Sequence, residues 1–263
     1  MIKSVEKALS ILTYMIDETS HMPVPLGVIA DACKLNPSTC SHLIDTLCEG
    51  TYLEKVSRKD GYILGPMAFS ISTQRHYRKE LTEAALPVMR CLSGTLFEDS
   101  SLSTFSNGKL FVPLTVFYHD EGIKYMRLKT GKLYQSAAGR LFIANMSQRQ
   151  RDDLIAGIGF PTPDVWDVGP DHKSMEKTLR DIRKNGVVVA DKVADSLSAV
   201  SAPVFGDGQM QAAVGVYMES ERFHGDHLSE CIILTTQAAE RIGQRMKEIL
   251  ANSGKTVRDG ADA

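Results

Sequence analysis

Residues 36–50 read Asn-Pro-Ser-Thr-Cys-Ser-His-Leu-Ile-Asp-Thr-Leu-Cys-Glu-Gly, and this stretch decides the fold of the first part of the chain. Asn36 can cap a helix, and Pro37 suits the first helical position because its missing N–H would have no partner there. Gly50 stands where a residue in the left-handed conformation would end the helix. The apolar stripe predicted for this helix consists of Cys40, Leu43, Ile44 and Leu47. The opposite face is polar and consists of Ser38, Thr39, Ser41, His42 and Asp45.

The sequence on either side of this helix supplies the other elements of a winged helix-turn-helix. Upstream, apolar residues at helical spacing predict a helix over residues 5–16 with Ser4 as its N-cap, and a shorter helix over 26–33. Downstream, residues 52–64 read as a hairpin, with two short strands around the polar segment 57–61. Two helices that cross through a tight turn leave the second one exposed, so that it fits the major groove of DNA. The hairpin beside it can contact the DNA backbone or the minor groove.

The rest of the chain predicts a linker and a second domain. Residues 67–97 read as helical with a break near Pro87, and a basic cluster at 75–79 lies in the first part, which we interpret as a linker helix over 67–80. From residue 81 to 251, strand-like and helical patterns alternate, which predicts an α+β domain with a mostly antiparallel sheet. The predicted strands are 101–105, 110–117, 123–128, 187–190, 199–205 and 212–218, and the predicted helices are 136–146, 148–156, 174–185 and 228–250. The tail, 252–263, is polar and is expected to be disordered.

Composition excludes several classes of protein. The chain has 263 residues, of which 43% are hydrophobic and 24% charged, as in ordinary globular proteins. Five cysteines without CxxC spacing argue against a disulfide framework or a zinc site and fit a reducing cytoplasm. No apolar run reaches the roughly 18 residues needed to span a bilayer, so no membrane partner is expected. The formal net charge of −2 predicts no bulk attraction to nucleic acid.

No motif in the chain predicts an enzyme. The nucleophile-elbow, zincin and phosphate-loop patterns are all missing, so we expect neither catalysis nor a cofactor. Two histidines in the segment 224–227 are too weak a pattern for a metal site, because no cysteine or carboxylate set accompanies them in the sequence.

Six segments of the sequence resemble IclR-family transcriptional regulators. They are residues 4–12, 37–43, 61–66, 136–140, 182–186 and 200–205. The resemblance implies a winged helix-turn-helix over 1–66, a linker helix over 67–80 and a GAF-like effector-binding domain over 81–251. It also implies homodimers, or dimers of dimers, on palindromic double-stranded DNA.

The candidate DNA-binding residues lie on the polar helix face and at the hairpin tip. They are Pro37, Ser38, Thr39, Ser41, His42, Arg58 and Lys59. Residues 1–66 hold six basic and eight acidic side chains, and none of the basic ones lies between Asn36 and Glu54. The family often has arginine at the position of His42. We therefore expect phosphate contacts from the hairpin tip and from the cluster at 75–79, with a small dependence of affinity on salt.

The resemblance also implies an effector site in the second domain. Its candidate residues are Ser136, Ala137, Ala138, Gly139, Asp191, Ala199, Gly215 and Tyr217. In the family, the segment that matches 136–139 opens a helix whose amides suit a carboxylate. In the family, the positions that match Ala199, Gly215 and Tyr217 often carry thiol or hydroxyl side chains. Asp191 roughly matches a position at which the family has an acidic residue that faces the ligand. We hypothesise that fewer polar contacts here favour an organic acid that is bulkier or more apolar than small keto acids.

Plainer interpretations stand beside these. The polar face at 38–42 can be the solvated side of an ordinary helix, and Ser136 can be a cap and nothing more. The acidic balance of residues 1–66 also fits a ligand-sensing or interaction protein with weak DNA binding. An enzyme acting on the bound ligand is a further alternative, against which stands the lack of a clustered nucleophile and base.

Overall fold

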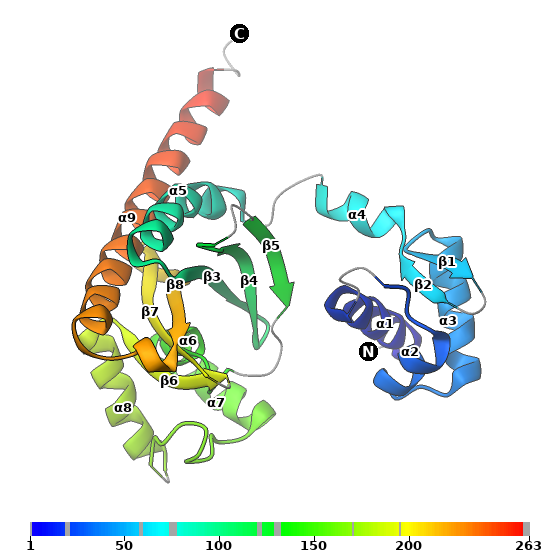
Figure 1. The fold of residues 1–263 in the computed structure, drawn as a ribbon, viewed down its shortest axis with the longest axis horizontal. Coiled ribbons are helices and arrows are strands. Elements are labelled where there is room, and N and C mark those ends of the chain that lie inside the picture. The colour runs from blue at the N-terminus through cyan, green and yellow to red at the C-terminus, as the bar shows by residue number, and fades with distance from the viewer. Residues whose placement is uncertain are drawn as a thin grey trace. The chain divides into compact units, whose positions relative to one another are not determined.

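A computed structural model describes residues 2–18, 22–57, 60–73, 78–119, 123–128, 133–169, 171–194 and 196–259, and all structural statements refer to these. The chain divides into two compact units, Met1–Tyr77 and Arg78–Ala263 (Figure 1). Each unit has a hydrophobic core of its own and is described separately.

The first unit has the element order of a winged helix-turn-helix. Its elements are α1 (Lys3–Glu18), α2 (Leu26–Ala32), α3 (Pro37–Glu49), β1 (Leu53–Ser57), β2 (Gly61–Leu64) and α4 (Pro66–Thr73). Strands β1 and β2 form an antiparallel hairpin, and Val24 adds an isolated bridge to Tyr62. Helices α1, α2 and α3 and the hairpin enclose one core, in which Ile11, Ile29 and Ile44 are fully buried. This unit therefore confirms the predicted helix, short helix, turn, helix and hairpin.

Two helix boundaries in this unit differ from the prediction. Helix α1 begins at Lys3, so Ser4 lies inside the helix and is not its N-cap. At the end of α3, Gly50 has φ −76°, and Thr51 takes the left-handed conformation with φ 57°. Gly50 still donates its N–H to the carbonyl of Thr46, and the reversal occurs one residue later, at Thr51, whose N–H bonds to the carbonyl of Cys48.

The break in the helical segment after the hairpin lies elsewhere than expected. Helix α5 spans Lys79–Leu96, and Arg78 before it is in the left-handed conformation with φ 50°, so the segment 67–80 is not one continuous helix. Residues 74–77, which include part of the basic cluster, lie outside the described residues. Pro87 lies inside α5 and does not interrupt it. A proline costs a helix one hydrogen bond. Here burial of the apolar face of α5 against the second unit's core, including Ala84, Val88 and Leu92, outweighs that loss.

The second unit is built on a six-stranded sheet in which every pair of neighbours is antiparallel. The strand order is β5-β4-β3-β8-β7-β6. The strands are β3 (Asp99–Ser106), β4 (Lys109–Val116), β5 (Ile123–Leu128), β6 (Val188–Ala194), β7 (Leu197–Gly206) and β8 (Gln209–Glu219). The antiparallel α+β architecture predicted from the sequence is therefore confirmed.

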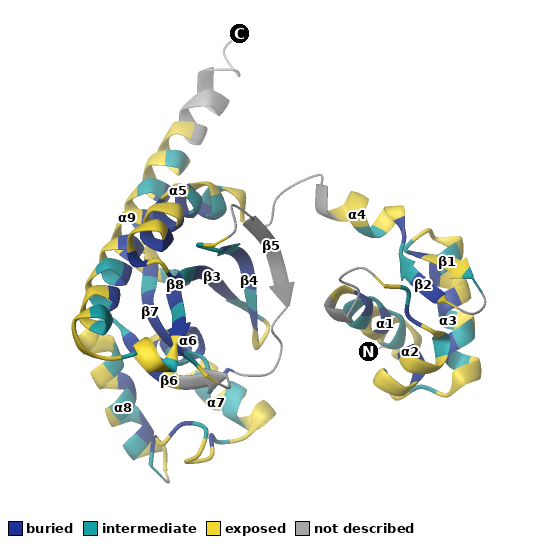
Figure 2. Cartoon of the chain, viewed as in Figure 1, coloured by how far each residue is buried: buried dark blue, intermediate teal, exposed yellow. Residues whose placement is uncertain are grey.

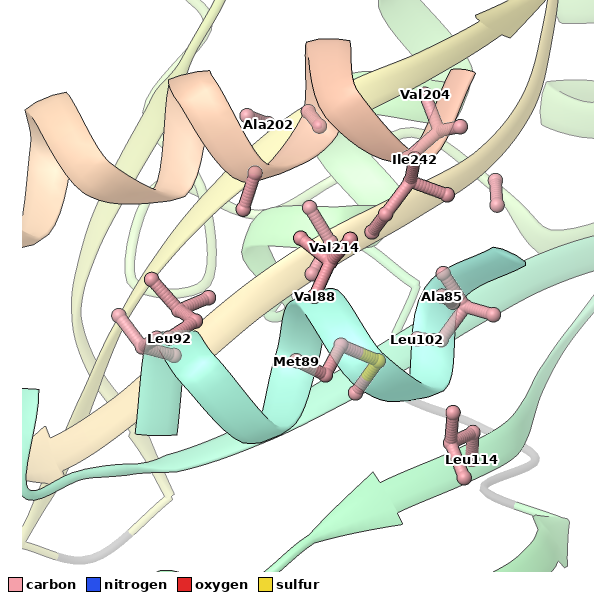
Figure 3. Close-up of a cluster of buried hydrophobic side chains, with 14 of the residues drawn as sticks. Ala85, Val88, Met89, Leu92, Leu102, Leu114, Ala202, Val204, Val214 and Ile242 are labelled. Atoms are coloured by element: carbon pink, nitrogen blue, oxygen red, sulfur yellow. The ribbon is translucent and has the colours of Figure 1, made fainter. Parts of the chain in front are cut away.

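Helices cover both faces of this sheet. The helices after α5 are α6 (Ala137–Asn145), α7 (Gln148–Ile158), α8 (His172–Asn185), the 3₁₀ turn η1 (Ser220–Arg222) and α9 (Gly225–Asp259). On one face, α5 and α9 lie side by side and bury Val88, Val214 and Ile242 among others (Figure 3). On the other face, α6 packs on β6, β7 and β8, and α8 packs against α6. Figure 2 shows the buried residues concentrated on the central strands between these layers.

The end of the chain corrects another expectation. Helix α9 continues to Asp259, so residues 252–259 of the predicted tail are helical, and residues 260–263 lie outside the described residues. As far as the chain is described, no helix combines the length and the apolarity needed to cross a membrane.

Candidate functional site

The first turn of α3 presents polar groups on the surface of the first unit. Asn36 caps the helix, because its Oδ1 accepts a hydrogen bond from the Ser38 backbone N–H at 2.9 Å. Pro37, Ser38 and His42 are exposed. Thr39 and Ser41 are half-buried, so they offer less surface to a partner. The exposed residues of this turn can reach a neighbouring macromolecule without a change of fold.

The opposite side of α3 anchors it in the core. Cys40, Ile44 and Leu47 are buried. Burial raises the pKa of the Cys40 thiol to about 11, so this side chain is a neutral packing group at neutral pH. The apolar stripe predicted from the sequence is thus confirmed, and it fixes which side of α3 faces outward.

The exposed face of α3 also carries negative charge. Asp45 and Glu49 are exposed and lie one and two turns beyond His42, on the same side of the helix. The candidate cations at the hairpin tip, Arg58 and Lys59, lie outside the described residues. At the start of α5, Arg78 donates from Nη1 to the Gln211 carbonyl at 3.1 Å, and Lys79 pairs with Glu83 at 3.6 Å. These two members of the basic cluster therefore have partners within the second unit.

In the second unit, the first turn of α6 is capped in the same way but is buried. Ser136 Oγ accepts a hydrogen bond from the Gly139 N–H at 2.9 Å. Ala137 and Ala138 are 2% and 3% exposed. A Cβ at Gly139 would lie 1.9 Å from the Leu133 carbonyl oxygen, so only glycine fits there. The turn is therefore built for close approach of backbone to backbone.

Arg140, which follows this turn, supports it and does not point a cation at a ligand. Its Nε donates to the Tyr134 carbonyl at 2.8 Å and its Nη2 to the Val165 carbonyl at 3.0 Å. The guanidinium lies over the Trp166 ring, 5.3 Å from its centroid. Burial lowers the pKa of Arg140. The side chain thus joins α6 to the loop that precedes α8.

Strand register brings three further candidates to the sheet face that α6 covers. Ala199 on β7 pairs with Tyr217 on β8, and residues directly opposite each other share a face. Ala199 and Tyr217 belong to the same buried cluster as Ala137 and Ala138. Gly215, two residues before Tyr217 on β8, lies on the same face. The structure therefore gathers seven of the eight candidate effector residues around α6.

Asp191 is the exception, and the structure corrects its placement. Its neighbour Ala190 packs in the cluster under α6, and side chains alternate along a strand, so Asp191 points to the opposite face. There its Oδ1 accepts a hydrogen bond from Ser198 Oγ at 2.5 Å. Asp191 is exposed and is tied to β7, away from the first turn of α6.

Two residues that the sequence pattern did not single out lie on the face under α6. Ser101 on β3 and Ser201 on β7 both pair with Gly215, from either side. Both serines are buried. Side chains alternate along a strand, so Ser101 points away from the face of its neighbour Leu102, and Ser201 away from that of Val200. With the strand order known, this alternation places both serines on the face under α6. That order comes from tertiary structure and is not visible in the sequence.

A separate cavity of about 1010 Å³ lies at the other end of α6. It is bordered by the β3–β4 and β7–β8 turns and by α7, and the stacked rings of Phe105 and Phe142 line it with centroids 5.6 Å apart. None of the eight candidate effector residues is in its described lining. The cavity is thus distinct from the site at the first turn of α6.

These features define a class of protein: a winged helix-turn-helix unit followed by a GAF-like α+β unit. The family model described as "Bacterial transcriptional regulator IclR C-terminal" matches residues 74–244. The chain therefore belongs to the IclR family of bacterial transcriptional regulators. A comparison with curated proteins found no match.

Solved structures share this fold across nearly the whole chain. The IclR regulator of Alicyclobacillus acidocaldarius has a TM-score of 0.73 at 16% identity, covering 94% of this chain and 99% of its own. An IclR homologue of Microbacterium hydrocarbonoxydans, complexed with 4-hydroxybenzoate, has a TM-score of 0.69 at 16% identity, covering 92% and 99%. Thermotoga maritima IclR has a TM-score of 0.64 at 16% identity, covering 94% and 99%.

Proposed function

We propose that this regulator binds specific double-stranded DNA through α3 and that a small organic acid bound at the first turn of α6 controls the binding. The observation that carries the first part is the capped N-terminal part of α3, in which Ser38 in the first turn and His42 in the second are both exposed. Helices with this position in a helix-turn-helix read base edges from their first turns. The hairpin tip, with Arg58 and Lys59, supplies phosphate contacts in this proposal.

The buried first turn of α6 supports the second part. Its amide groups and small side chains suit a carboxylate, because the N-terminus of a helix attracts negative charge. The ligand named for the Microbacterium homologue, 4-hydroxybenzoate, is an aromatic carboxylic acid and belongs to this chemical class. The effector would act by favouring one arrangement of subunits in a homodimer or dimer of dimers. That arrangement would set the spacing of two recognition helices on a palindromic operator.

The family is one of transcriptional regulators, so the proposal assigns regulation and not catalysis to the chain. One observation favours a second candidate function, a ligand sensor with weak DNA binding. The outward face of α3 carries Asp45 and Glu49, and α3 contains neither lysine nor arginine. DNA affinity separates the two functions.

The test is fluorescence anisotropy of the full-length protein on the DNA upstream of its own gene, with unrelated duplex as competitor and salt as a variable. Binding that survives the competitor supports the regulator, and the salt slope counts phosphate contacts. Binding equal to that of the competitor supports the weak-binding sensor.

Two variants assign the roles of residues in this assay. His42→Ala should weaken operator binding and change sequence preference, whereas Lys59→Ala should weaken binding to all sequences alike. His172→Ala and Lys177→Ala, exposed positions on α8, are the matched controls and should bind like the wild type. Unchanged affinity in both His42→Ala and Lys59→Ala would show that α3 and the hairpin are not the DNA-binding surface.

A further inference from the structure

The sheet of the second unit extends past the end of α6. Helix α6 has 9 residues and is about 14 Å long, whereas β8 has 11 residues and spans about 36 Å. One short helix therefore cannot cover the face that these strands present. At the β3–β4 and β7–β8 turns, this face borders the cavity of about 1010 Å³, which α7 closes from another side. Sites for drug-sized molecules have volumes of roughly 300 to 1,000 Å³, so the cavity is large enough for such a ligand.

Aromatic and aliphatic side chains form the apolar part of this cavity. Phe105 on β3 and Phe142 on α6 stack with their ring centroids 5.6 Å apart. Phe205 on β7 pairs with Met210 on β8, so these two side chains share a face. Phe205 is 45% exposed, and Ile158 at the end of α7 is 51% exposed. Large apolar side chains that are exposed together in one cavity mark a surface for binding.

The lining of the cavity also includes polar side chains. Five of them are amides, namely Asn107, Asn145, Gln150, Gln209 and Gln211. An amide side chain can both donate and accept hydrogen bonds. The cavity can therefore hold a ligand that combines an apolar body with polar groups.

Two charged side chains in the described lining, Arg78 and Asp153, differ in their surroundings. Arg78 donates from Nη1 to the Gln211 carbonyl at 3.1 Å and to Gln211 Oε1 at 3.3 Å. Its guanidinium is thus held by β8. Asp153 on α7 is exposed and has no hydrogen bond or ion pair within the described part of the chain. The carboxylate of Asp153 is therefore available to a ligand, whereas Arg78 already has a partner.

We propose that this cavity is a second ligand site of the second unit and that it takes an organic cation with a planar aromatic body. The faces of aromatic rings attract cations, and Phe105, Phe142 and Phe205 all line the cavity. The ring system of the ligand packs against these phenylalanines, and its cationic group pairs with Asp153. This site is separate from the one proposed for the acid effector and does not depend on it.

The test is isothermal titration of the full-length protein, without DNA, with two probes of the same ring system. In slightly alkaline buffer 9-aminoacridine is a cation, whereas acridine is neutral. The wild type should bind both probes and should bind the cation about fivefold more tightly, because the carboxylate and the aromatic faces each add to its affinity. Neither probe carries a carboxylate, so the result is independent of the acid effector.

Two variants locate the probes in the cavity. Gly157→Leu adds a side chain on α7 where nothing lies within 4 Å of the new Cβ, so the variant should fold and fill part of the cavity. It should weaken the binding of both probes about tenfold. Phe205→Ala removes a half-exposed ring and should weaken both about fivefold.

Each of these variants has a matched control outside the cavity lining. Gly94→Leu adds the same side chain on α5, where nothing lies within 4 Å of the Cβ either. Phe97→Ala removes a ring that is 57% exposed. Both controls should bind the two probes like the wild type.

A further pair of variants tests the charge. Asp153→Asn should bring the affinity ratio of 9-aminoacridine to acridine to about half its wild-type value and leave acridine binding unchanged. Asp152, the neighbouring residue on α7, is also exposed but does not line the cavity. Asp152→Asn should leave the ratio as it is.

The outcomes distinguish the site from its preference for cations. A wild type that binds neither probe, or unchanged affinities in both Gly157→Leu and Phe205→Ala, overturns the site. Equal affinities of the wild type for the two probes, or an unchanged ratio in Asp153→Asn, overturn the assignment of an organic cation. In every case the proposed acid effector stands or falls by its own titration.

Discussion

Two helix N-termini in this chain are capped alike and lie in opposite surroundings. In α3, Asn36 accepts the Ser38 N–H at 2.9 Å, and in α6, Ser136 accepts the Gly139 N–H at 2.9 Å. The first turn of α3 is exposed, whereas that of α6 is buried against the sheet. In the proposed function, the exposed turn faces DNA and the buried turn binds a small acid. The two turns share capping chemistry, and burial is the property that distinguishes them.

The largest expected effect comes from Gly139, where the buried turn is tightest. Gly139→Ala should lower the free energy of unfolding of the second unit by about 3 kcal/mol, because the new Cβ collides with the backbone at Leu133. Urea denaturation followed by circular dichroism measures this. Gly94→Ala in α5 is the control: nothing lies within 4 Å of its Cβ, and alanine should stabilise the helix by about 1 kcal/mol. Equal stability of the two variants would contradict the contrast between the two helix N-termini, because it would show that the first turn of α6 is not tightly packed.

The second-largest effect is the loss of stability when the N-cap of α3 or of α6 is removed. Asn36→Ala should cost the first unit about 1 kcal/mol, the ordinary value of an N-cap, since water can replace the lost bond. Ser136→Ala should cost the second unit about 2 kcal/mol, since it leaves a buried N–H without its partner. Denaturation of each variant, with the two units followed separately, gives the difference. Equal costs would contradict the role assigned to burial.

The smallest effect concerns charge on the exposed helix. The double variant Asp45→Asn, Glu49→Gln should raise affinity for any DNA duplex about threefold, because two exposed carboxylates no longer repel phosphate. Anisotropy at low salt measures this, and the gain should fade as salt rises. Asp31→Asn on α2, also exposed, is the control and should change little. No gain in the double variant would place the exposed face of α3 away from DNA.

Local patterns predicted much of the fold. The caps of α3 and α6, the apolar stripe of α3 and the hairpin could all be read from short stretches, because each depends on neighbours within a few residues. Pro87 shows the limit of such rules. A local rule places a helix break there, but the packing of α5 on the sheet and α9 keeps the helix whole. Thr51 shows a smaller limit of local rules. The left-handed conformation after α3 occurs at Thr51, although the neighbouring Gly50 could adopt that conformation more easily.

The proposed effector site shows the same limit of local rules more strongly. Ala137, Ala138 and Gly139 could be proposed together from one motif, since they are consecutive in the chain. Asp191 was expected at the ligand, but strand alternation turns it to the other face of the sheet. Ser101 and Ser201 were not expected on this face of the sheet. They are 100 residues apart in the chain, yet both pair with the same residue, Gly215.

The element types, the N-caps of α3 and α6, the helix-turn-helix order and the resemblance to the IclR family follow from the sequence, because they depend on residues close together along the chain. Tertiary structure alone decided which capped turn is exposed and which hydroxyls share a face. Strand order and register set those relations between distant residues, and a shift of one residue in register turns every side chain of a strand to the other face.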